Sequence, residues 1–549
     1  MARGATRSVG RRRAPVDGAV VRSATSSGMT RREFVAALTG VGLGAAVATS
    51  CAPEAPSWPP LGPGSADPGA FPEGVMAGDP LPDGAVIWTR VDVPQATSGV
   101  EVVWSVSRSP DFDSIVVGGL ALAHPDTGYS VKVPVTGLAA DRWYHYRFEA
   151  LGSTSRSGRL RTAPAPGSSP DRLRFAFASC QQLSSQFVAH RAIAREEGLD
   201  FLMHLGDYIY ADDAATLTRE QYRNAYGHWR MQPDLRELHS VLPTVAMWDD
   251  GEFFNGVDAT ADPQRLTAAT LAWFDSFPTS DPGDSTAFRA LSWGDLADIP
   301  MIDVRSHRDP AAEETDYTSI GTPHDPARTT LGAEQYRWLT GLLDRSSASW
   351  RVIGNPYNIA PWKLVNLEWL RPFRPEMPAG AGIYAPNEAW DDYLRERRDL
   401  LGHLEAHNIE DTVFASGHTH MFITSELRVE DEPSRTPVSA DFCTGSLTAD
   451  PDLRTAYLGD LPLEAAEAVL EVAENWVVAN NAPSMRHFNM VEQGYSVMEL
   501  NPEELVVTHR LVDTHDPAAQ PRDGARFRVR RGSAHIEVLP TPGASGAFA

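Results

Sequence analysis

Five short apolar segments between residues 173 and 416 each run directly into a polar motif. These motifs are Ser179-Cys180-Gln181, Gly206-Asp207-Tyr208-Ile209-Tyr210, Asp249-Asp250-Gly251-Glu252, Gly354-Asn355-Pro356 and Gly417-His418-Thr419-His420. Helical patterns lie between the apolar segments, over 188–197, 334–343 and 390–407. Strands that alternate with helices favour a parallel sheet, and such sheets place their ligands beyond the carboxyl ends of the strands. The pattern therefore predicts an α/β domain with its polar motifs gathered at one edge of the sheet.

The residues before this region have a different pattern. Valine-rich and aromatic runs are separated by turn-forming residues, at 84–90, 100–106, 129–135 and 143–149. Runs of this kind predict an all-β domain over 71–165, of fibronectin or immunoglobulin type. None of the three cysteines lies in this region, which favours the fibronectin-like variety.

Three further stretches complete the predicted organisation. Residues 51–70 are rich in proline and glycine and are expected to form a linker. The α/β domain is expected over 171–515. Residues 516–549 are expected to be a C-terminal tail with one strand-like run, 534–539.

The first fifty residues resemble an export signal. Arg31-Arg32 precedes an apolar run, 34–48, which is shorter than the ~20 residues needed to cross a bilayer. A twin arginine in this position resembles a Tat signal. We therefore expect 1–50 to be an N-terminal extension with a Tat signal, the Tat machinery to be a partner, and the protein to be extracellular or in the cell envelope. Residues 48–51 weakly resemble a lipoprotein processing site, which leaves a lipid tether at Cys51 open.

Charge and cysteine content exclude several classes of protein. The chain has 48 Lys and Arg against 72 Asp and Glu, a net charge of −24, so we expect no nucleic-acid-binding surface. A hydrophobic content of 42% excludes a disordered chain. Three cysteines do not make a disulfide scaffold, which leaves Cys180 available as a ligand. We expect a monomer.

The motifs at the strand ends carry side chains that bind metals. The two imidazoles of Gly-His-x-His can point toward two adjacent ions, and the aspartate of Gly-Asp-x-x-Tyr can bridge them while the phenolate reaches one. Phenolate and thiolate ligands favour an oxidised iron. Two ions ~4 Å apart suit phosphoryl transfer, because they stabilise both the attacking and the leaving oxygen.

Each motif also has a purely structural interpretation, which the sequence leaves open. Tyr210 can be an ordinary aromatic residue at a helix start, and Asp250 can cap a helix. Asn355 can be a turn residue before a proline, and Cys180 can be an inert buried thiol. The motifs are more informative as an ordered set than singly.

Taken as a set, the motifs resemble the alkaline phosphatase D (PhoD-like) family of metallophosphoesterases. The resemblance is carried by Phe71–Arg90, Ala178–Gln181, Gly206–Tyr210 and Trp248–Glu252, with further family-like segments at 303–308, 331–338, 350–355, 390–393, 494–500 and 511–514. It extends over nearly the whole chain after the signal. It implies an α+β sandwich of β-sheets flanked by helices, preceded by the all-β domain.

The resemblance implies a two-metal site. Four residues would hold Fe3+: Cys180, Asp207, Tyr210 and His420. Asp207 would bridge to a divalent ion, usually Ca2+ in the family, which would also bind Asp250, Asn355 and His418. A metal-activated hydroxide would then attack the phosphorus of a small phosphate monoester or diester, with Asn255 and Arg305 as candidates for contacting phosphate oxygens.

Two positions depart from the family pattern. Gly251 stands where the family has a histidine that could protonate the leaving group, and His418 stands where it usually has an aspartate. An imidazole at the second site favours Zn2+ or Mn2+ over Ca2+. Two alternatives to an alkaline phosphatase D-like enzyme therefore remain: a catalytically impaired envelope binding protein, and a phosphomonoesterase of the purple acid type.

Overall fold

The computed structural model describes residues 69–541, with gaps at 94, 96–97, 184, 212–215, 281–285, 313–321, 376, 378, 385–389, 433, 450–460 and 462. The predicted signal, most of the predicted linker and Cys51 therefore lie outside the described residues. Among the residues that are described, no helix combines the length and apolar character needed to cross a membrane.

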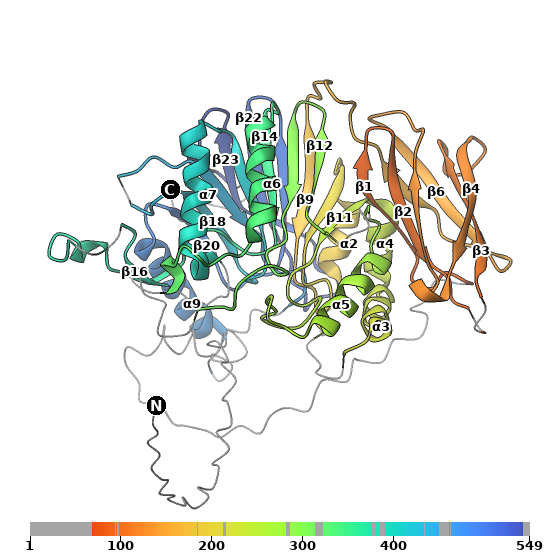
Figure 1. Ribbon diagram of the computed structural model, residues 1–549, viewed down its shortest axis with the longest axis horizontal. Coiled ribbons are helices and arrows are strands. Elements are labelled where there is room, and N and C mark those ends of the chain that lie inside the picture. The colour runs from red at the N-terminus through yellow and green to blue at the C-terminus, as the bar shows by residue number, and fades with distance from the viewer. Residues whose placement is uncertain are drawn as a thin grey trace, which may run out of the picture.

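The N-terminal domain is built entirely of strands around a core of its own (Figure 1, right). Its strands are β1 Val75–Leu81, β2 Gly84–Arg90, β3 Val100–Ser107, β4 Ile115–Ala123, β5 Ser130–Val135, β6 Trp143–Ala150, β7 Ser153–Thr154 and β8 Gly158–Arg161. They form the sheets β1-β2-β5 and β4-β3-β6-β7, with β8 paired to β6. In β6, buried and half-buried side chains alternate strictly, as expected for a strand with one face on a core. The all-β prediction is confirmed.

The α/β domain contains two seven-stranded sheets. The first is made of β9 Leu173–Ala178, β10 Phe201–Leu205, β11 Thr244–Met247, β21 Gly494–Leu500, β22 Glu504–Leu511, β23 Arg522–Arg530 and β24 Ile536–Leu539. The second is made of β12 Arg289–Trp293, β13 Ala297–Met301, β14 Trp350–Asn355, β17 Thr412–Ser416, β18 Phe422–Leu427, β19 Ser439–Cys443 and β20 Met485–Asn489. A short hairpin pairs β15 Lys363–Asn366 with β16 Gly382–Tyr384.

Both large sheets are mixed. Their strand orders are β11-β10-β9-β21-β22-β23-β24 and β12-β13-β14-β17-β19-β18-β20. Strands β9, β10 and β11 are parallel, as are β13, β14, β17 and β19, and the remaining pairings are antiparallel. One apolar cluster contains Phe175 and Met203 of the first sheet together with Trp350 and Val352 of the second. The two sheets therefore pack face to face on a shared core.

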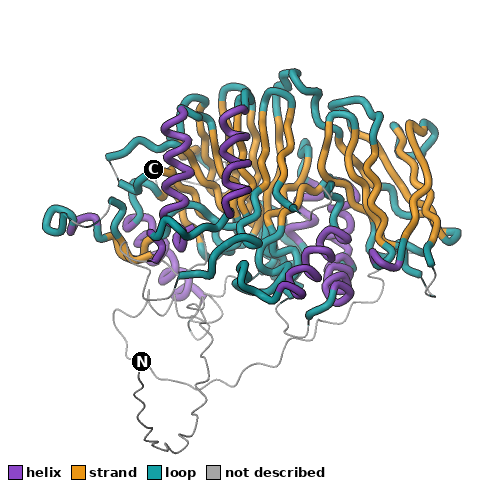
Figure 2. The backbone as a smooth tube through the Cα atoms, viewed as in Figure 1, coloured by secondary structure: helices purple, strands orange, loops and turns teal. Residues whose placement is uncertain are grey.

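Helices lie on the outer faces and along the lower edge of this sandwich (Figure 1). They are α2 Val188–Arg195, α3 Arg219–Arg230, α4 Pro233–Val241, α5 Pro263–Ser276, α6 Gly332–Arg345, α7 Leu394–His407 and α9 Leu463–Asn480, with short 3-10 turns at Pro125–Thr127, Thr322–His324, Glu368–Leu370 and Trp390–Tyr393. Helices α2 and α4 share an apolar cluster with the first sheet, and α6 and α7 share one with the second. The predicted fold class, an α+β sandwich flanked by helices, is confirmed. Figure 2 shows long loops along the lower edge of the sheets and short turns along the upper edge.

The expectation of a separate tail after residue 515 is wrong. Strands β23 and β24 extend the first sheet at its edge. Phe527 and Val529 are buried, whereas the arginines that alternate with them face outward, where Arg528 pairs with Glu537 at 2.6 Å. Because of these charged side chains, the sequence of β23 resembles that of a solvent-exposed segment.

Candidate metal centre

The polar motifs meet because the strands that precede them are neighbours. Cys180 follows β9, and its N–H donates to the carbonyl of Gly206, which follows β10. Asn355 ends β14 in register with Ser416, the last residue of β17. A bridge between Ser179 and Ser446 joins the ends of the two sheets. Residues from both sheets therefore converge at one edge of the sandwich.

The first donor group contains Cys180, Asp207 and His420, whose ligand atoms lie within 4.8 Å of one another. The Sγ atom of Cys180 is 3.2 Å from Oδ2 of Asp207. The hydroxyl of Tyr210 is 3.0 Å from Nε2 of His420 and 3.4 Å from Oδ2 of Asp207. The structure thus brings together all four residues that the resemblance implied as iron ligands.

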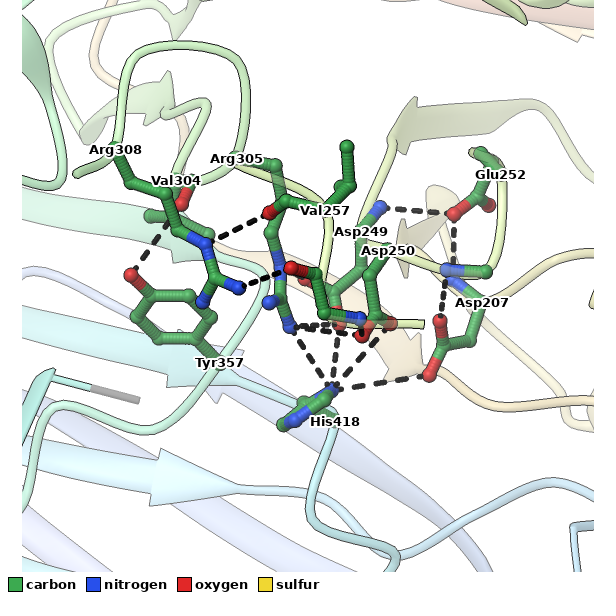
Figure 3. A network of polar contacts seen from close by, with 12 residues as sticks. Asp207, Asp249, Asp250, Glu252, Val257, Val304, Arg305, Arg308, Tyr357 and His418 are labelled. Atoms are coloured by element: carbon green, nitrogen blue, oxygen red, sulfur yellow. Dashed lines mark hydrogen bonds and ion pairs between the residues drawn. The ribbon is translucent and has the colours of Figure 1, made fainter. Parts of the chain in front are cut away.

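The second donor group contains Asp207, Asp249, Asp250 and His418, again within 4.8 Å of one another (Figure 3). Nδ1 of His418 is 2.7 Å from Oδ2 of Asp249, 3.9 Å from Asp207 and 4.0 Å from Asp250. Asp207 belongs to both groups, which is the position that a bridging carboxylate requires.

Asp249 is a member of this group that sequence reasoning missed. The two adjacent aspartates, Asp249 and Asp250, are evident in the sequence, but their spacing does not show which carboxylate faces the site. In the structure, both carboxylates belong to the donor group. Asn355, the predicted ligand, is buried, and its carboxamide donates to Ser416 and accepts from the Trp390 indole at 3.2 Å. Its oxygen is therefore already engaged, and its role as a ligand stays a prediction.

Arg305 lies beside the second donor group, and its contact with phosphate oxygens stays a prediction. Its side chain is completely buried, with Nη2 at 3.0 Å from Oδ2 of Asp249 and 3.6 Å from Asp250 (Figure 3). A buried guanidinium needs carboxylate partners, and Asp249 and Asp250 are the ones that Nε and Nη2 face. Burial by itself raises the pKa of Asp249, but the Arg305 guanidinium and the His418 imidazole outweigh this effect and hold that pKa below its ordinary value. Asn255 is exposed in the adjacent loop, and its contact with phosphate stays a prediction.

Glu252 fixes the backbone of the site and was also missed as a functional residue. Its carboxylate accepts from the N–H groups of Asp207 at 3.0 Å, Tyr208 at 2.8 Å and Asp249 at 2.9 Å. Burial raises the pKa of Glu252 to about 8. Its place at the end of the family-like Trp248–Glu252 motif was the signal that could have identified it.

Gly251 is required by close packing of the loops. Its N–H donates to Oδ1 of Asp207 at 3.0 Å. A Cβ atom at this position would lie 2.4 Å from the carbonyl oxygen of Ile209 and 2.7 Å from Oδ1 of Asp207. No real side chain tolerates contacts this short, so the backbone geometry requires a glycine at this position.

Four donor residues adopt the left-handed backbone region. The φ angles are 62° at Cys180, 54° at Asp207, 72° at His418 and 57° at His420. Such conformations are unfavourable for residues other than glycine and cluster at functional sites. An inert buried thiol would not need one, which weighs against the structural interpretation of Cys180. The thiol of the third cysteine, Cys443, is buried and donates to the carbonyl oxygen of Gly417, 3.2 Å from Sγ.

The electrostatics of the site fit bound cations. Asp207, Asp249 and Asp250 are buried within one group, and the Arg305 guanidinium lies beside it. Burial and the neighbouring carboxylates raise the pKa of Asp207 well above its ordinary value. A cation among these carboxylates would relieve their repulsion. The thiol, phenol and imidazole of the first group are donors that suit ferric iron.

Comparisons with known proteins agree with this architecture. A family model described as PhoD-like phosphatase matches residues 175–509, and one for the N-terminal domain of that phosphatase matches 57–164. Alkaline phosphatase D of Bacillus subtilis (strain 168) is 30% identical, over 76% of each sequence. A solved structure of PhoD superposes with a TM-score of 0.75 and 26% identity, covering 90% of this chain and 95% of that one.

A purple acid phosphatase from yellow lupin seeds shares the fold more distantly. Its TM-score is 0.53 at 12% identity, with 84% of this chain and 75% of that chain covered. The PhoD-like phosphatase model, by contrast, matches well over half of the sequence, including every donor residue of the metal centre. The chain therefore belongs to the PhoD-like phosphatase family of phosphoester hydrolases.

Proposed function

We propose that this protein hydrolyses small phosphate monoesters or diesters with two metal ions held at the sheet edge. The observation that carries the proposal is the membership of Asp207 in both donor groups. Two groups of donors that share one carboxylate suit a pair of adjacent ions, the arrangement used for in-line displacement at phosphorus.

Each donor group favours its own ion. Cys180, Tyr210 and His420 would hold Fe3+ together with Asp207. The second group offers three carboxylates and one imidazole. Ca2+ takes oxygen ligands, whereas an imidazole suits Zn2+ or Mn2+, so we favour Zn2+ or Mn2+ there and keep Ca2+ as the alternative.

The chain's own residues hold this site in place. When bound, the two ions supply charge neutralisation for the phosphoryl oxygens and a lowered pKa for water. Arg305 orients Asp249 through a buried ion pair, and Glu252 fixes three N–H groups of the motif loops. Gly251 provides no side chain to protonate the leaving group. Esters with acidic leaving groups should therefore be the better substrates.

Activity of the metal-loaded protein tests the proposal. Asp207→Asn removes a carboxylate shared by both groups and should abolish hydrolysis of p-nitrophenyl phosphate. Asp275→Asn is a matched control, since Asp275 is also buried but pairs with Arg219 outside the site. Hydrolysis by Asp207→Asn at the wild-type rate would refute the proposed site, and no hydrolysis by the metal-loaded wild type would support the alternative of a binding protein. A purple acid type of enzyme would differ in metal content and in pH optimum.

We further propose that the protein is exported through the Tat pathway as a folded monomer and acts outside the cytoplasm. The support is the Arg31-Arg32 pair before the apolar run 34–48. Export after folding would allow the metal centre to be assembled first. Replacing both arginines by lysine should retain the protein in the cytoplasm, as fractionation of the host would show. Labelling with radioactive palmitate would decide whether Cys51 carries a lipid.

A further inference from the structure

Helices α6 and α7 lie side by side on the outer face of the second sheet (Figure 1). Each is followed after four residues by its strand, β14 or β17, and these two strands are parallel. The helices therefore run in the same direction and end at the edge where the strands begin. The candidate metal centre lies at the opposite edge, where the strands end.

Three metal-binding side chains meet at the C-terminal ends of these two helices. His403 and His407 are one turn apart on α7, and Asp344 is in the last turn of α6. Nε2 of His403 is 2.9 Å and Nδ1 of His407 is 2.7 Å from the same carboxylate oxygen, Oδ1 of Asp344. The two imidazole rings are 4.0 Å apart between centroids. All three ligand atoms lie within 4.8 Å of one another.

This group differs from an ordinary surface ion pair in two respects. Two imidazoles converge on one oxygen, and a pair at i and i+4 on a helix is a common chelating arrangement for transition metals. The group also lies where two helices end, and the negative ends of both helix dipoles favour a cation there. The side chains are 16% exposed at His403, 37% at Asp344 and 49% at His407, so an ion from solvent can reach them.

We propose that Asp344, His403 and His407 form a separate site for a divalent transition-metal ion. Two nitrogens and one carboxylate oxygen suit Zn2+, Ni2+ or Cu2+, with Cu2+ bound most tightly among them. The ion takes the place of the hydrogen bonds that now join the two ring nitrogens to Oδ1. It links α6 to α7 and so fixes the outer layer of helices on the second sheet. This proposal does not rest on the phosphatase activity.

Binding of Zn2+ by the full-length metal-loaded protein provides the test. The variant His403→Gln/His407→Gln removes both imidazoles. The control His124→Gln/His515→Gln removes two solvent-accessible histidines, each of which lies beside an aspartate. Equilibrium dialysis should show that the wild type and the control bind one more equivalent of Zn2+ than the paired variant. Asp344→Asn should weaken this binding at least tenfold.

Two further readouts separate loss of the site from misfolding. Added Zn2+ should raise the melting temperature of the wild type and the control but not of the paired variant, with equal melting temperatures before addition. Hydrolysis of p-nitrophenyl phosphate should be unchanged in the paired variant. An electron paramagnetic resonance spectrum of bound Cu2+ should show coupling to nitrogen that the paired variant lacks. Equal Zn2+ stoichiometry and affinity in the paired variant and the wild type would overturn the proposal.

Discussion

Restoring the family histidine at position 251 should damage this protein. A Cβ atom there would approach the Ile209 carbonyl oxygen to 2.4 Å and Oδ1 of Asp207 to 2.7 Å. Relief of these contacts requires the loops to separate, at a cost of about 1–3 kcal/mol for overpacking. Separation also weakens the hydrogen bond from the Gly251 N–H to Asp207, worth about 1.5–3 kcal/mol because its acceptor is charged. The sum predicts a loss of roughly 2.5–6 kcal/mol for Gly251→His.

The same change should lower activity, because the displaced carboxylate belongs to both donor groups. Urea unfolding would measure the loss of stability, and hydrolysis of p-nitrophenyl phosphate would measure the loss of activity. Gly251→Ala should show most of both effects, since the Cβ atom alone makes the short contacts. Gly402→Ala in α7 is the control, because its Cβ atom would meet only Val429 at an ordinary 3.6 Å. A Gly251→His variant that is as stable as the wild type and hydrolyses esters faster would refute this reasoning.

Three other predictions follow from the site and the fold. Arg305→Met leaves Asp249 buried without its guanidinium and should lower the free energy of unfolding of metal-free protein by about 3–5 kcal/mol, as measured in urea. The decrease should be smaller when metal is bound, and an equal decrease with and without metal would contradict the role of a cation. Since no side chain at Gly251 donates a proton, aryl phosphates should be hydrolysed at least about 100-fold faster than alkyl phosphates, and equal rates would show that another group donates it. Phe527→Ala should destabilise the protein by about 3–5 kcal/mol, whereas a dispensable tail would show no loss.

The location of the candidate site was predictable because its signals are local. An apolar strand followed by a polar motif can be read from a short stretch of sequence, and neighbouring parallel strands end at the same edge. The motifs that contain Cys180, Asp207, Tyr210 and His420 were therefore identified together without knowledge of the packing, and the resemblance to the PhoD-like family assigned these four residues to one ion. The all-β character of residues 71–165 was predictable for the same reason.

The remaining features depend on contacts between distant segments. Arg305 pairs with Asp249, from which it is 56 residues away in the sequence. Nothing in the sequence shows that this arginine is buried. Strand β23, which lies next to the edge strand β24, was hidden by its arginines, which alternate with buried side chains over residues 526–530. The spacing of His403 and His407 is visible in the sequence, but Asp344 reaches them only because α6 and α7 are packed together.

The most direct test of the central claim is the metal content of three variants, measured by elemental analysis with the visible absorption spectrum. Ferric iron bound to the phenolate of Tyr210 and the thiolate of Cys180 should give a visible charge-transfer band. His420→Ala should lose iron and this band while keeping the divalent ion. His418→Ala should lose the divalent ion while keeping the band. Asp207→Asn should lose both, because Asp207 belongs to both donor groups. Wild-type protein that binds no iron, or an Asp207→Asn variant that keeps both ions, would contradict a two-metal centre bridged by Asp207.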